Sequence, residues 1–431
     1  MNTIEEIYGI LGKNPKISTD SRKITPESVF FALKGDIFDG NKYAEEALKK
    51  GARYAIIDEK EFQFSEKMFL VDDVLETLQK LAQLHRKKLG IPILGITGTN
   101  GKTTTKELIA GVLSQKFNVS FTQGNLNNHI GVPLTLLSMD SHTEFGIVEM
   151  GANHQGEIAK LCLIADPDYG IITNIGKAHL EGFGSFEGVK KAKAELYNYI
   201  KSKNGTVFIN GENQILTELS EGIKKISFGS NGYDFVGEPV KSPPFAHVKA
   251  TFPKGVLYLN TSLIGDFNYE NIMAAACIGN YFGVDPLKIQ QAIKDYKPSN
   301  IRSQLIDKND VKIIIDTYNA NPTSMKASIT SFLNAGNPHS QSFLILGDML
   351  ELGTYSNIEH TAILNLINNI PKKNIFLVGK IFSEVAENSD WNTFENTEQL
   401  CSYLNKNPIK SGYVLIKGSR GIKLEKTLDC F

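Results

Sequence analysis

The sequence carries little net charge and no long hydrophobic run. Its 46 Lys and Arg residues nearly balance 47 Asp and Glu residues, which leaves a formal charge of -1 and no overall attraction to nucleic acid or anionic membranes. No apolar stretch approaches the roughly 20 residues needed to span a bilayer. The first residues, MNTIEEIYGILGK, are acidic where a signal peptide would be basic. We therefore expect a cytoplasmic protein with no nucleic-acid or membrane partner and a small-molecule or peptide substrate.

Cysteine is also scarce, with four residues in 431. The cysteines form neither a CxxC pair nor a zinc-binding spacing, which argues against a disulfide scaffold and a zinc site. We expect all four to be reduced and structural: Cys162, Cys277, Cys401 and Cys430. There is no internal repeat or low-complexity segment, and the 41% hydrophobic and 22% charged content is typical of a soluble globular protein. The length favours two to four domains.

Apolar, strand-like runs alternate with amphipathic helical stretches along nearly the whole chain, which is typical of α/β folds built on mostly parallel sheets. A small first unit holds the predicted strands 28–33 and 53–58. A central unit opens with the apolar run IPILGIT and continues through a β-rich patch at residues 205–265. After a polar segment around residues 298–303, interpreted as a hinge, a third unit has the strands VKIIID, SFLILGD, NIFLVG and YVLIKG.

These units predict an α/β protein of three domains. The last resembles an open, dinucleotide-binding type of sheet, although it lacks the GxGxxG fingerprint. The predicted domains are a small α/β domain at residues 1–88, a central domain with a mostly parallel sheet of the P-loop ATPase type at 89–299, and a Rossmann-like domain at 300–431.

The glycine-rich loop GITGTNGKTTT follows a predicted strand and precedes a predicted helix. Such a loop presents backbone N–H groups and a helix N-terminus to phosphates, with Lys102 reaching the β- and γ-phosphates and Thr103 binding magnesium. The strict P-loop spacing is not met, because position 96 is isoleucine and Gly95 lies one residue early. A turn without a ligand is the alternative, but the strand, the GKT and the helix together favour a nucleotide site made of Gly98, Thr99, Asn100, Gly101, Lys102, Thr103 and Thr104.

Several other residues are ambiguous from their sequence positions alone. Glu149 ends an apolar strand, where P-loop proteins often place a magnesium ligand, although a solvent-facing glutamate is also consistent. Asp316 and Asp348 also end strands, where they either face a ligand crevice or cap the next helix. Arg302, Lys417 and Arg420 are candidates to hold phosphate or carboxylate, or are ordinary surface cations. His179 and Lys193 would not be selected on chemistry, because magnesium prefers oxygen and lysine runs are usually solvated.

Assembled in order, the motifs resemble those of the Mur ligases, ATP-dependent amide ligases that build the peptide stem of peptidoglycan precursors. The resemblance spans all three predicted domains through GTNGKTT, VEMGANH, NIGKAHLEGFGS, AKAEL, DTYNANPTSM, LGDMLELG and IKGSRG. Four of these, EMGANH, HLEGFGS, YNANP and GDMLELG, resemble the family member that adds D-alanyl-D-alanine to UDP-N-acetylmuramoyl-tripeptide. The resemblance implies that this chain carries out the same ligation through an acyl phosphate. It also implies that the first domain binds the UDP-sugar.

The resemblance also implies roles that the residues alone do not. A histidine at the position of His179 binds a second magnesium ion, and a lysine 14 residues later, here Lys193, is carbamylated. A carbamate would give this lysine an oxygen ligand. The implied cofactors are therefore ATP and two Mg²⁺ ions, held by Thr103, Glu149, His179 and carbamylated Lys193. The implied catalytic residues are Lys102, Lys193, His179 and Arg302.

The same resemblance assigns contacts for each substrate. Asn271 is expected at adenine, Asp316 at ribose and Arg302 at the γ-phosphate. On the UDP-sugar side the expected residues are Asp20, Ser21, Arg22, Asn125, Asn127 and Asn128, and at the dipeptide they are Tyr318, Asn319, Asn321 and Asp348.

Two positions depart from the family pattern. Phe267 stands where relatives commonly have histidine before the adenine asparagine, which removes an edge contact. Ile301 precedes Arg302 where a glycine is usual, which predicts a different local backbone.

We expect a monomer, and three alternatives to this function remain. One is another amide ligase of the superfamily, such as the enzyme adding the third stem residue or folylpolyglutamate synthase. The second is a phosphotransferase or nucleotide switch, and the third is an inactive binding module. The intact motifs of the third domain argue against the first alternative, and the intact loop, Glu149, His179 and Lys193 argue against the last.

Overall fold

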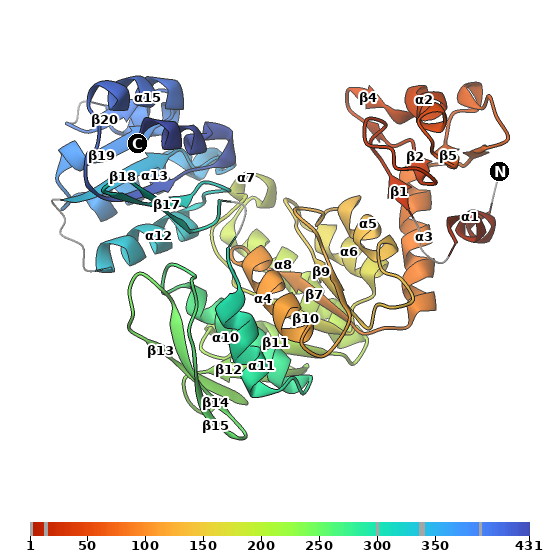
Figure 1. Ribbon diagram of the computed structural model, residues 1–431, viewed down its shortest axis with the longest axis horizontal. Coiled ribbons are helices and arrows are strands. Elements are labelled where there is room, and N and C mark those ends of the chain that lie inside the picture. Colours follow the sequence, from red (N-terminus) through yellow and green to blue (C-terminus); the bar gives the residue numbers. More distant parts are fainter. Residues whose placement is uncertain (1–2, 13–15, 299–300, 336–340, 388–389) are drawn as a thin grey trace.

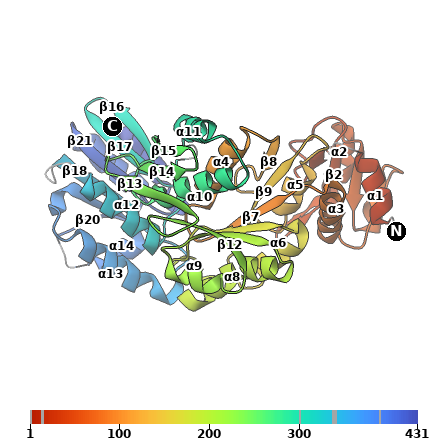
Figure 2. The ribbon, with the colours of Figure 1, turned by 90° about the horizontal axis from the view of Figure 1, so that it is seen from below.

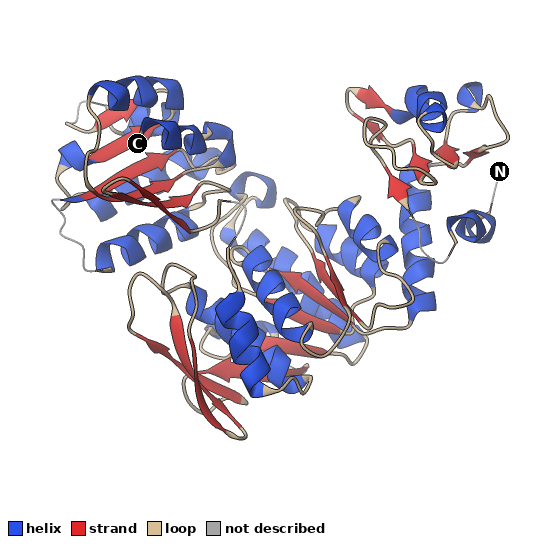
Figure 3. Ribbon diagram, in the orientation of Figure 1, coloured by secondary structure: helices blue, strands red, loops and turns tan. Residues whose placement is uncertain are grey.

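The computed structural model describes residues 3–12, 16–298, 301–335, 341–387 and 390–431. These residues form three β-sheets in succession along the chain, each with helices on both faces (Figures 1 and 3). The predicted α/β class with parallel-rich sheets is thereby confirmed. None of the helices in the described ranges is both long and apolar enough to cross a membrane.

The first sheet is parallel, with the strand order β1-β2-β5-β6. Small residues of α2, such as Ala44 and Ala47, pack on one face, and Ile7 of α1 and Leu78 of α3 pack on the other. A short hairpin, β3 and β4, lies beside it. The bounds are β1 Ile17–Ser18, β2 Val29–Phe31, β3 Lys34–Gly35, β4 Phe38–Asp39, β5 Tyr54–Ile57, β6 Met68–Leu70, α1 Ile4–Leu11, α2 Ala44–Lys49 and α3 Val74–Leu89.

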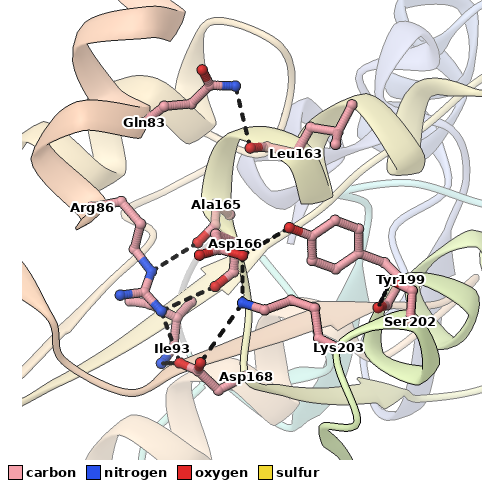
Figure 4. Close-up of polar contacts among 10 residues, drawn as sticks. All are labelled: Gln83, Arg86, Ile93, Leu163, Ala165, Asp166, Asp168, Tyr199, Ser202 and Lys203. Atoms are coloured by element: carbon pink, nitrogen blue, oxygen red, sulfur yellow. Dashed lines mark hydrogen bonds and ion pairs between the residues drawn. The ribbon is translucent and has the colours of Figure 1, made fainter.

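Helix α3 joins the first sheet to the central one. Its N-terminus is capped by the side chain of Asp73, and it ends at Gly90, which takes a left-handed conformation with φ of 64°. Near its C-terminal end, the buried Arg86 donates to the carbonyl oxygens of Ala165 (3.1 Å) and Asp166 (3.0 Å). Figure 4 shows this guanidinium among the backbone groups that it joins. The helix is therefore fastened to the central unit by hydrogen bonds.

Asp168 completes this junction. Its Oδ2 accepts from the Arg86 guanidinium (2.8 Å) and from the backbone N–H of Ile93 (2.9 Å), at the start of the first central strand. Lys203 forms ion pairs with Asp166 and Asp168, and Tyr199 donates to Asp166 (2.8 Å; Figure 4). The domain boundary predicted at 88/89 thus falls at the end of a helix that contacts both units. The boundary predicted at 299/300 lies outside the described residues. The division into domains therefore stays a prediction.

The central sheet has nine strands in the order β15-β14-β13-β12-β11-β10-β7-β9-β8. Strands β8 to β13 pair in parallel, whereas β13, β14 and β15 pair antiparallel. Their bounds are β7 Ile93–Thr97, β8 Val119–Phe121, β9 Phe145–Glu149, β10 Tyr169–Ile172, β11 Thr206–Asn210, β12 Lys224–Gly229, β13 Phe235–Val240, β14 His247–Phe252 and β15 Gly255–Leu259.

Two helical layers cover this sheet. Helices α4 (Lys102–Leu113), α10 (Asn268–Tyr281) and α11 (Pro286–Asp295) pack on one face. Helices α5 (Gly131–Leu137), α6 (Glu157–Ala165) and α8 (Phe186–Ser202) pack on the other. Figure 2 shows α8 on the opposite side of the sheet from α4 and α10. Two short helices, α7 (Leu180–Phe183) and α9 (Gln214–Leu219), complete the unit, and α9 interrupts the stretch that was predicted to be β-rich.

The third sheet has the order β16-β17-β21-β18-β19-β20, with β16 antiparallel and the others parallel. Four of these strands were predicted, and the hairpin strand β16 and the short β20 were not. The bounds are β16 Gln304–Lys308, β17 Val311–Asp316, β18 Ser342–Gly347, β19 Ile375–Val378, β20 Asn392–Phe394, β21 Gly412–Lys417, α12 Pro322–Asn334, α13 Ser356–Ile367, α14 Lys380–Val385 and α15 Thr397–Lys406. Helix α15 covers one face, and α12, α13 and α14 cover the other.

Candidate active site

A cavity of about 1050 Å³ lies between the carboxyl ends of the central strands and the third sheet. This is where open α/β sheets bind ligands, and the volume is large enough for a nucleotide with a second ligand beside it. It brings together residues that are up to 322 positions apart, from Gly98 to Arg420, and 19 of the predicted site residues line it: Gly98, Thr99, Asn100, Gly101, Lys102, Thr103, Thr104, Asn125, Asn127, Asn128, Glu149, His179, Lys193, Asn271, Arg302, Asp316, Tyr318, Asn319 and Asn321.

The glycine-rich loop connects β7 to α4, as predicted. Two of its glycines are required by geometry. Gly98 has φ of 143°, and a Cβ there would lie 2.0 Å from Oγ1 of Thr173. Gly101 has φ of 78°, and a Cβ there would lie 2.6 Å from Oδ1 of Asn271. The glycines therefore let the loop turn sharply into the N-terminus of α4, where free N–H groups favour an anion.

Lys102 folds back on this loop. Its Nζ donates to the carbonyl oxygens of Gly98 (2.7 Å) and Thr99 (3.1 Å). Burial lowers the pKa of Lys102, opposed by the negative charge of Glu149 and assisted by the positive charge of Arg302. A phosphate in the loop would exchange these carbonyl partners for charged oxygens.

Glu149 stands at the end of β9 with its carboxylate buried. It accepts from the Thr103 hydroxyl (3.1 Å) and the Asn127 amide (2.9 Å), and Nζ of Lys106 lies 3.3 Å away. Burial raises the pKa of Glu149, but the charges of Lys106 and Lys102 outweigh it, so the net shift is downward. Glu149 and Thr103 thus present adjacent oxygen atoms beside the phosphate loop.

His179 and Lys193 lie on the same side of the cavity. Lys193, in α8, is 3% exposed, and burial followed by repulsion from Lys102 lowers its pKa to about 7. Its Nζ lies 5.4 Å from the centre of the Phe183 ring. His179 has a left-handed backbone with φ of 50°, and its Nδ1 contacts the carboxylate of Glu351 from the third unit. Burial lowers the pKa of His179, although Glu351 acts in the opposite direction.

The residues predicted for the nucleoside line the end of the cavity beside α10, where Asn271 lies against Gly101 of the phosphate loop. Asn271, in α10, accepts at Oδ1 from the hydroxyl of Thr105 (2.9 Å) and donates to Asn268 (2.8 Å). Asp316 accepts from Nζ of Lys417 (2.5 Å) and from Ser328 (3.2 Å). Phe267, at the position where relatives commonly have histidine, also lines this end of the cavity.

Arg302 lies flat against Tyr318, with its Cζ 3.6 Å from the ring centre. Its Nε is buried and has no hydrogen-bond partner within the described part of the chain. The preceding Ile301 has φ of 57°, the left-handed region that favours glycine. Isoleucine here takes a conformation that glycine adopts without strain, and the expected difference from the backbone of relatives stays a prediction.

The central and third units also contact each other directly around the cavity. The side-chain amides of Asn100 and Asn321 exchange two hydrogen bonds (2.8 and 3.4 Å). Lys177 forms an ion pair with Glu359 of α13 (2.5 Å), and its backbone N–H donates to Thr323 (3.0 Å). The phosphate loop is thus tied to the N-terminus of α12, which Asn321 caps.

Four predicted residues do not line this cavity. Asp20, Ser21 and Arg22 lie in the turn that follows β1 of the first sheet, where Arg22 pairs with Asp20 (2.9 Å) and holds the pKa of Asp20 well below the usual range. Asp348 is buried and accepts from the backbone N–H groups of Ile381 (3.0 Å) and Phe382 (2.9 Å). It therefore caps α14, which is not the next helix along the chain, and it does not line the cavity where the dipeptide was expected.

The possible metal ligands are few. Among the residues that the structure describes, no group of three or more His, Cys, Asp or Glu side chains is placed to hold a metal ion. The Thr103 hydroxyl and the Glu149 carboxylate are the hard oxygen donors that magnesium prefers, and magnesium usually keeps water and substrate phosphate as its other ligands. This pair fits one Mg²⁺, whereas His179 and Lys193 fit a second ion only if the lysine acquires oxygen atoms.

Three residues that hold this site together were not selected from the sequence. Lys106, one turn along α4 from Thr103, is fully buried beside Glu149. Asn174 accepts from the backbone N–H of Asn100 (2.9 Å), and Glu351 contacts His179. Asn174 lies two residues beyond the end of β10, so its place after an apolar strand was an available signal.

Family models match most of the chain. The Mur ligase family catalytic domain matches residues 16–86, the Mur ligase middle domain matches residues 96–279, and the Mur ligase glutamate ligase domain matches residues 301–420.

Whole proteins are similar over the same extent. The UDP-N-acetylmuramoyl-tripeptide–D-alanyl-D-alanine ligase of Bacillus subtilis strain 168 is 34% identical over 443 aligned residues, which cover 99% of this chain and 96% of the relative. A crystal structure of MurF from Acinetobacter baumannii aligns with a TM-score of 0.86 and 30% identity, over 96% of this chain and 92% of that one. The MurF ligase of Thermotoga maritima in complex with ADP aligns with a TM-score of 0.84 and 28% identity, over 100% and 98%.

Proposed function

The chain belongs to the Mur ligase family, and we propose that it joins D-alanyl-D-alanine to the free carboxylate of UDP-N-acetylmuramoyl-tripeptide at the expense of ATP. The observation that carries this proposal is the single cavity in which a phosphate-binding loop faces polar and cationic groups of the third sheet. Such a site holds the nucleotide and the two substrates of an amide ligase together. The product is a precursor of peptidoglycan.

The reaction proceeds in two transfers. A carboxylate oxygen of the tripeptide attacks the γ-phosphorus of ATP, and ADP leaves. The amine of the dipeptide then attacks the carbonyl carbon of the acyl phosphate, and phosphate leaves as the amine loses a proton. Catalysis of such transfers depends mainly on positioning and charge stabilisation, so no covalent enzyme intermediate is required.

The cations around the loop supply that stabilisation. Lys102 leaves its carbonyl partners to bind the β- and γ-phosphates, and Arg302, whose Nε has no described partner, faces the transferred group. Magnesium would be held by Thr103 and Glu149, where it would neutralise phosphate charge. Asn271, beside the phosphate loop, and Asp316, at the end of β17, are assigned to adenine and ribose.

Lys193 is assigned as a carbamate that serves a second magnesium ion together with His179. Support comes from its burial and from a pKa of about 7, because carbon dioxide reacts with a neutral amine. Asn125, Asn127 and Asn128, which line the cavity, are assigned to the UDP-sugar side of the substrate. Asp20, Ser21 and Arg22 are assigned to the UDP end, which requires the first sheet to hold that end of a long substrate.

The alternative functions leave parts of the molecule unexplained. A phosphotransferase or nucleotide switch needs no second substrate site across the cavity and no first sheet to hold a UDP-sugar. An inactive binding module would not need Lys102, Thr103 and Glu149 to be kept together. Both proposed substrates and ATP are found in the cytoplasm, so the enzyme is assigned to that compartment. It is assigned as a monomer because one chain supplies every wall of the cavity.

The test is phosphate release from ATP in the presence of UDP-N-acetylmuramoyl-tripeptide, measured with and without D-alanyl-D-alanine. We expect release only when all three substrates are present, together with a pentapeptide product detectable by mass spectrometry. Turnover that is independent of the dipeptide would contradict the ligase assignment.

A further inference from the structure

Two arginine side chains lie against one tyrosine ring on the third-sheet wall of the cavity. The guanidinium carbon of Arg302 is 3.6 Å from the ring centre of Tyr318, and that of Arg420 is 5.7 Å from it. All three residues line the cavity. Because an aromatic ring attracts cations, Tyr318 holds two positive groups close together that would otherwise repel each other.

The backbone next to Arg420 is fixed by the buried Ser419. Its N–H donates to the carbonyl oxygen of Asp348 (3.1 Å), and its hydroxyl donates to that of Ala320 (3.3 Å) and accepts from the N–H of Leu350 (3.0 Å). The loops that follow β17, β18 and β21 are joined at this point. Arg420 therefore extends an exposed side chain from a rigid base, which is the arrangement that specific binding requires.

The other cations of the cavity are engaged elsewhere. Lys417 pairs with Asp316 and is 1% exposed, and Lys102 donates to the loop carbonyls. Lys160 belongs to α6, on the central wall. Arg420, by contrast, forms no ion pair with any described residue. Arg302, against the same ring, also has an unpartnered Nε among the described residues, but it is assigned to the transferred phosphate, which leaves Arg420 available for a different anion.

We propose that Arg420 binds the C-terminal carboxylate of the incoming dipeptide, an assignment that rests on the ligase function proposed above. A guanidinium binds a carboxylate through two parallel hydrogen bonds. Both guanidinium carbons lie at known distances from the centre of the Tyr318 ring. The separation between them therefore cannot exceed the sum of those two distances. Two extended residues span about 7 Å. A dipeptide held by Arg420 is therefore long enough to bring its amine towards the group that Arg302 faces.

The test compares two dipeptides, D-alanyl-D-alanine and its C-terminal amide, with wild-type enzyme and Arg420→Met. Loss of a charge-assisted pair should raise KM for the acid by about 10- to 100-fold. KM for the amide, which offers no carboxylate, should change less than about twofold. Arg420→Lys should recover part of the affinity for the acid, because it keeps the charge but not the paired geometry. KM values for ATP and UDP-N-acetylmuramoyl-tripeptide should not change.

Lys423→Met is the matched control, because Lys423 is an exposed cation three residues further on that does not line the cavity. It should leave all four KM values at their wild-type levels. The assignment would be overturned if Arg420→Met changed KM equally for the acid and the amide, or if it changed only KM for the tripeptide substrate. A wild-type enzyme that releases no phosphate in response to D-alanyl-D-alanine would contradict the ligase function itself, and this assignment with it.

Discussion

Among single residues, Lys193 is one whose chemistry is changed by burial. Its lowered pKa, about 7, means that the amine is neutral above that pH and protonated below it. With ¹³C-labelled bicarbonate we therefore expect a carbamate signal in the ¹³C NMR spectrum that grows as the pH rises through about 7. Lys193→Ala should lack the signal. A wild-type signal that does not depend on pH between 6 and 8 would contradict the role of the buried amine.

Loss of activity in Lys193→Ala should be partly reversed by a short carboxylic acid, which supplies the missing oxygen ligands. The measurement is dipeptide-dependent phosphate release with added acetate or propionate. The matched control is Lys191→Ala, an exposed lysine on the same helix, which should keep wild-type activity and show no response to the acid. Full activity of unrescued Lys193→Ala would remove the proposed role.

Glu149 and Lys106 form a buried ion pair, so removing one charge should cost more than removing both. We expect Glu149→Gln to lower the free energy of unfolding by about 3 kcal/mol, because Lys106 is left buried without its counter-ion. Adding Lys106→Met should recover a large part of that loss. Urea denaturation without nucleotide measures both values. A double variant no more stable than Glu149→Gln would contradict this pairing.

Among single residues, the sequence allowed us to predict those of the glycine-rich loop and Glu149, because strand ends and glycine spacing are local signals. It did not allow prediction of Lys106, whose partner lies 43 residues away along the chain. Nor did it decide between the two interpretations of Asp348, since only the packing of α14 against β18 determines which donors reach that carboxylate.

Among the elements, α3 owes its position to polar contacts at its C-terminal end. Arg86→Met should lower the free energy of unfolding by about 2 kcal/mol, because three acceptors lose a charged donor, two of them backbone carbonyl oxygens. The partly exposed side chain of Asp168 regains water, which limits the loss. The comparison is Gln83→Ala, which removes one neutral hydrogen bond to Leu163 and should cost less than about 1 kcal/mol. Equal effects would contradict the importance of the guanidinium.

The apolar run IPILGIT and the apolar strand expected to end at Glu149 coincide with β7 and β9, because buried parallel strands are almost uniformly apolar, whereas the strands after residue 205 were expected only as a β-rich patch. Two strands of the third sheet that were not predicted lack such uniformly apolar runs. Strand β16, in the sequence QLIDK, alternates buried and exposed residues at the sheet edge, and β20 has only three residues. Such strands depend on a neighbour for their hydrogen bonds, so their own sequence carries little signal.

In the whole molecule, the central and third units are coupled through Lys177 and Glu359. A double-mutant cycle of Lys177→Met and Glu359→Gln should give a coupling energy of about 0.5 to 1 kcal/mol, since the lysine side chain is half exposed and solvent weakens the pair. Chemical denaturation of the four proteins measures it. Additive effects of the two changes would contradict a direct interaction. No local pattern predicts such a contact, because it joins residues 182 positions apart.

The attachment of α3 also has a practical consequence for dividing this protein into pieces. A fragment that begins after Lys88 would lack the helix that covers Leu136 and Leu161, and it would present that apolar surface to solvent. It would also lose the donor that neutralises Asp168. Expression clones of the catalytic portion should therefore start before Asp73, with α3 retained as part of the core they are meant to preserve.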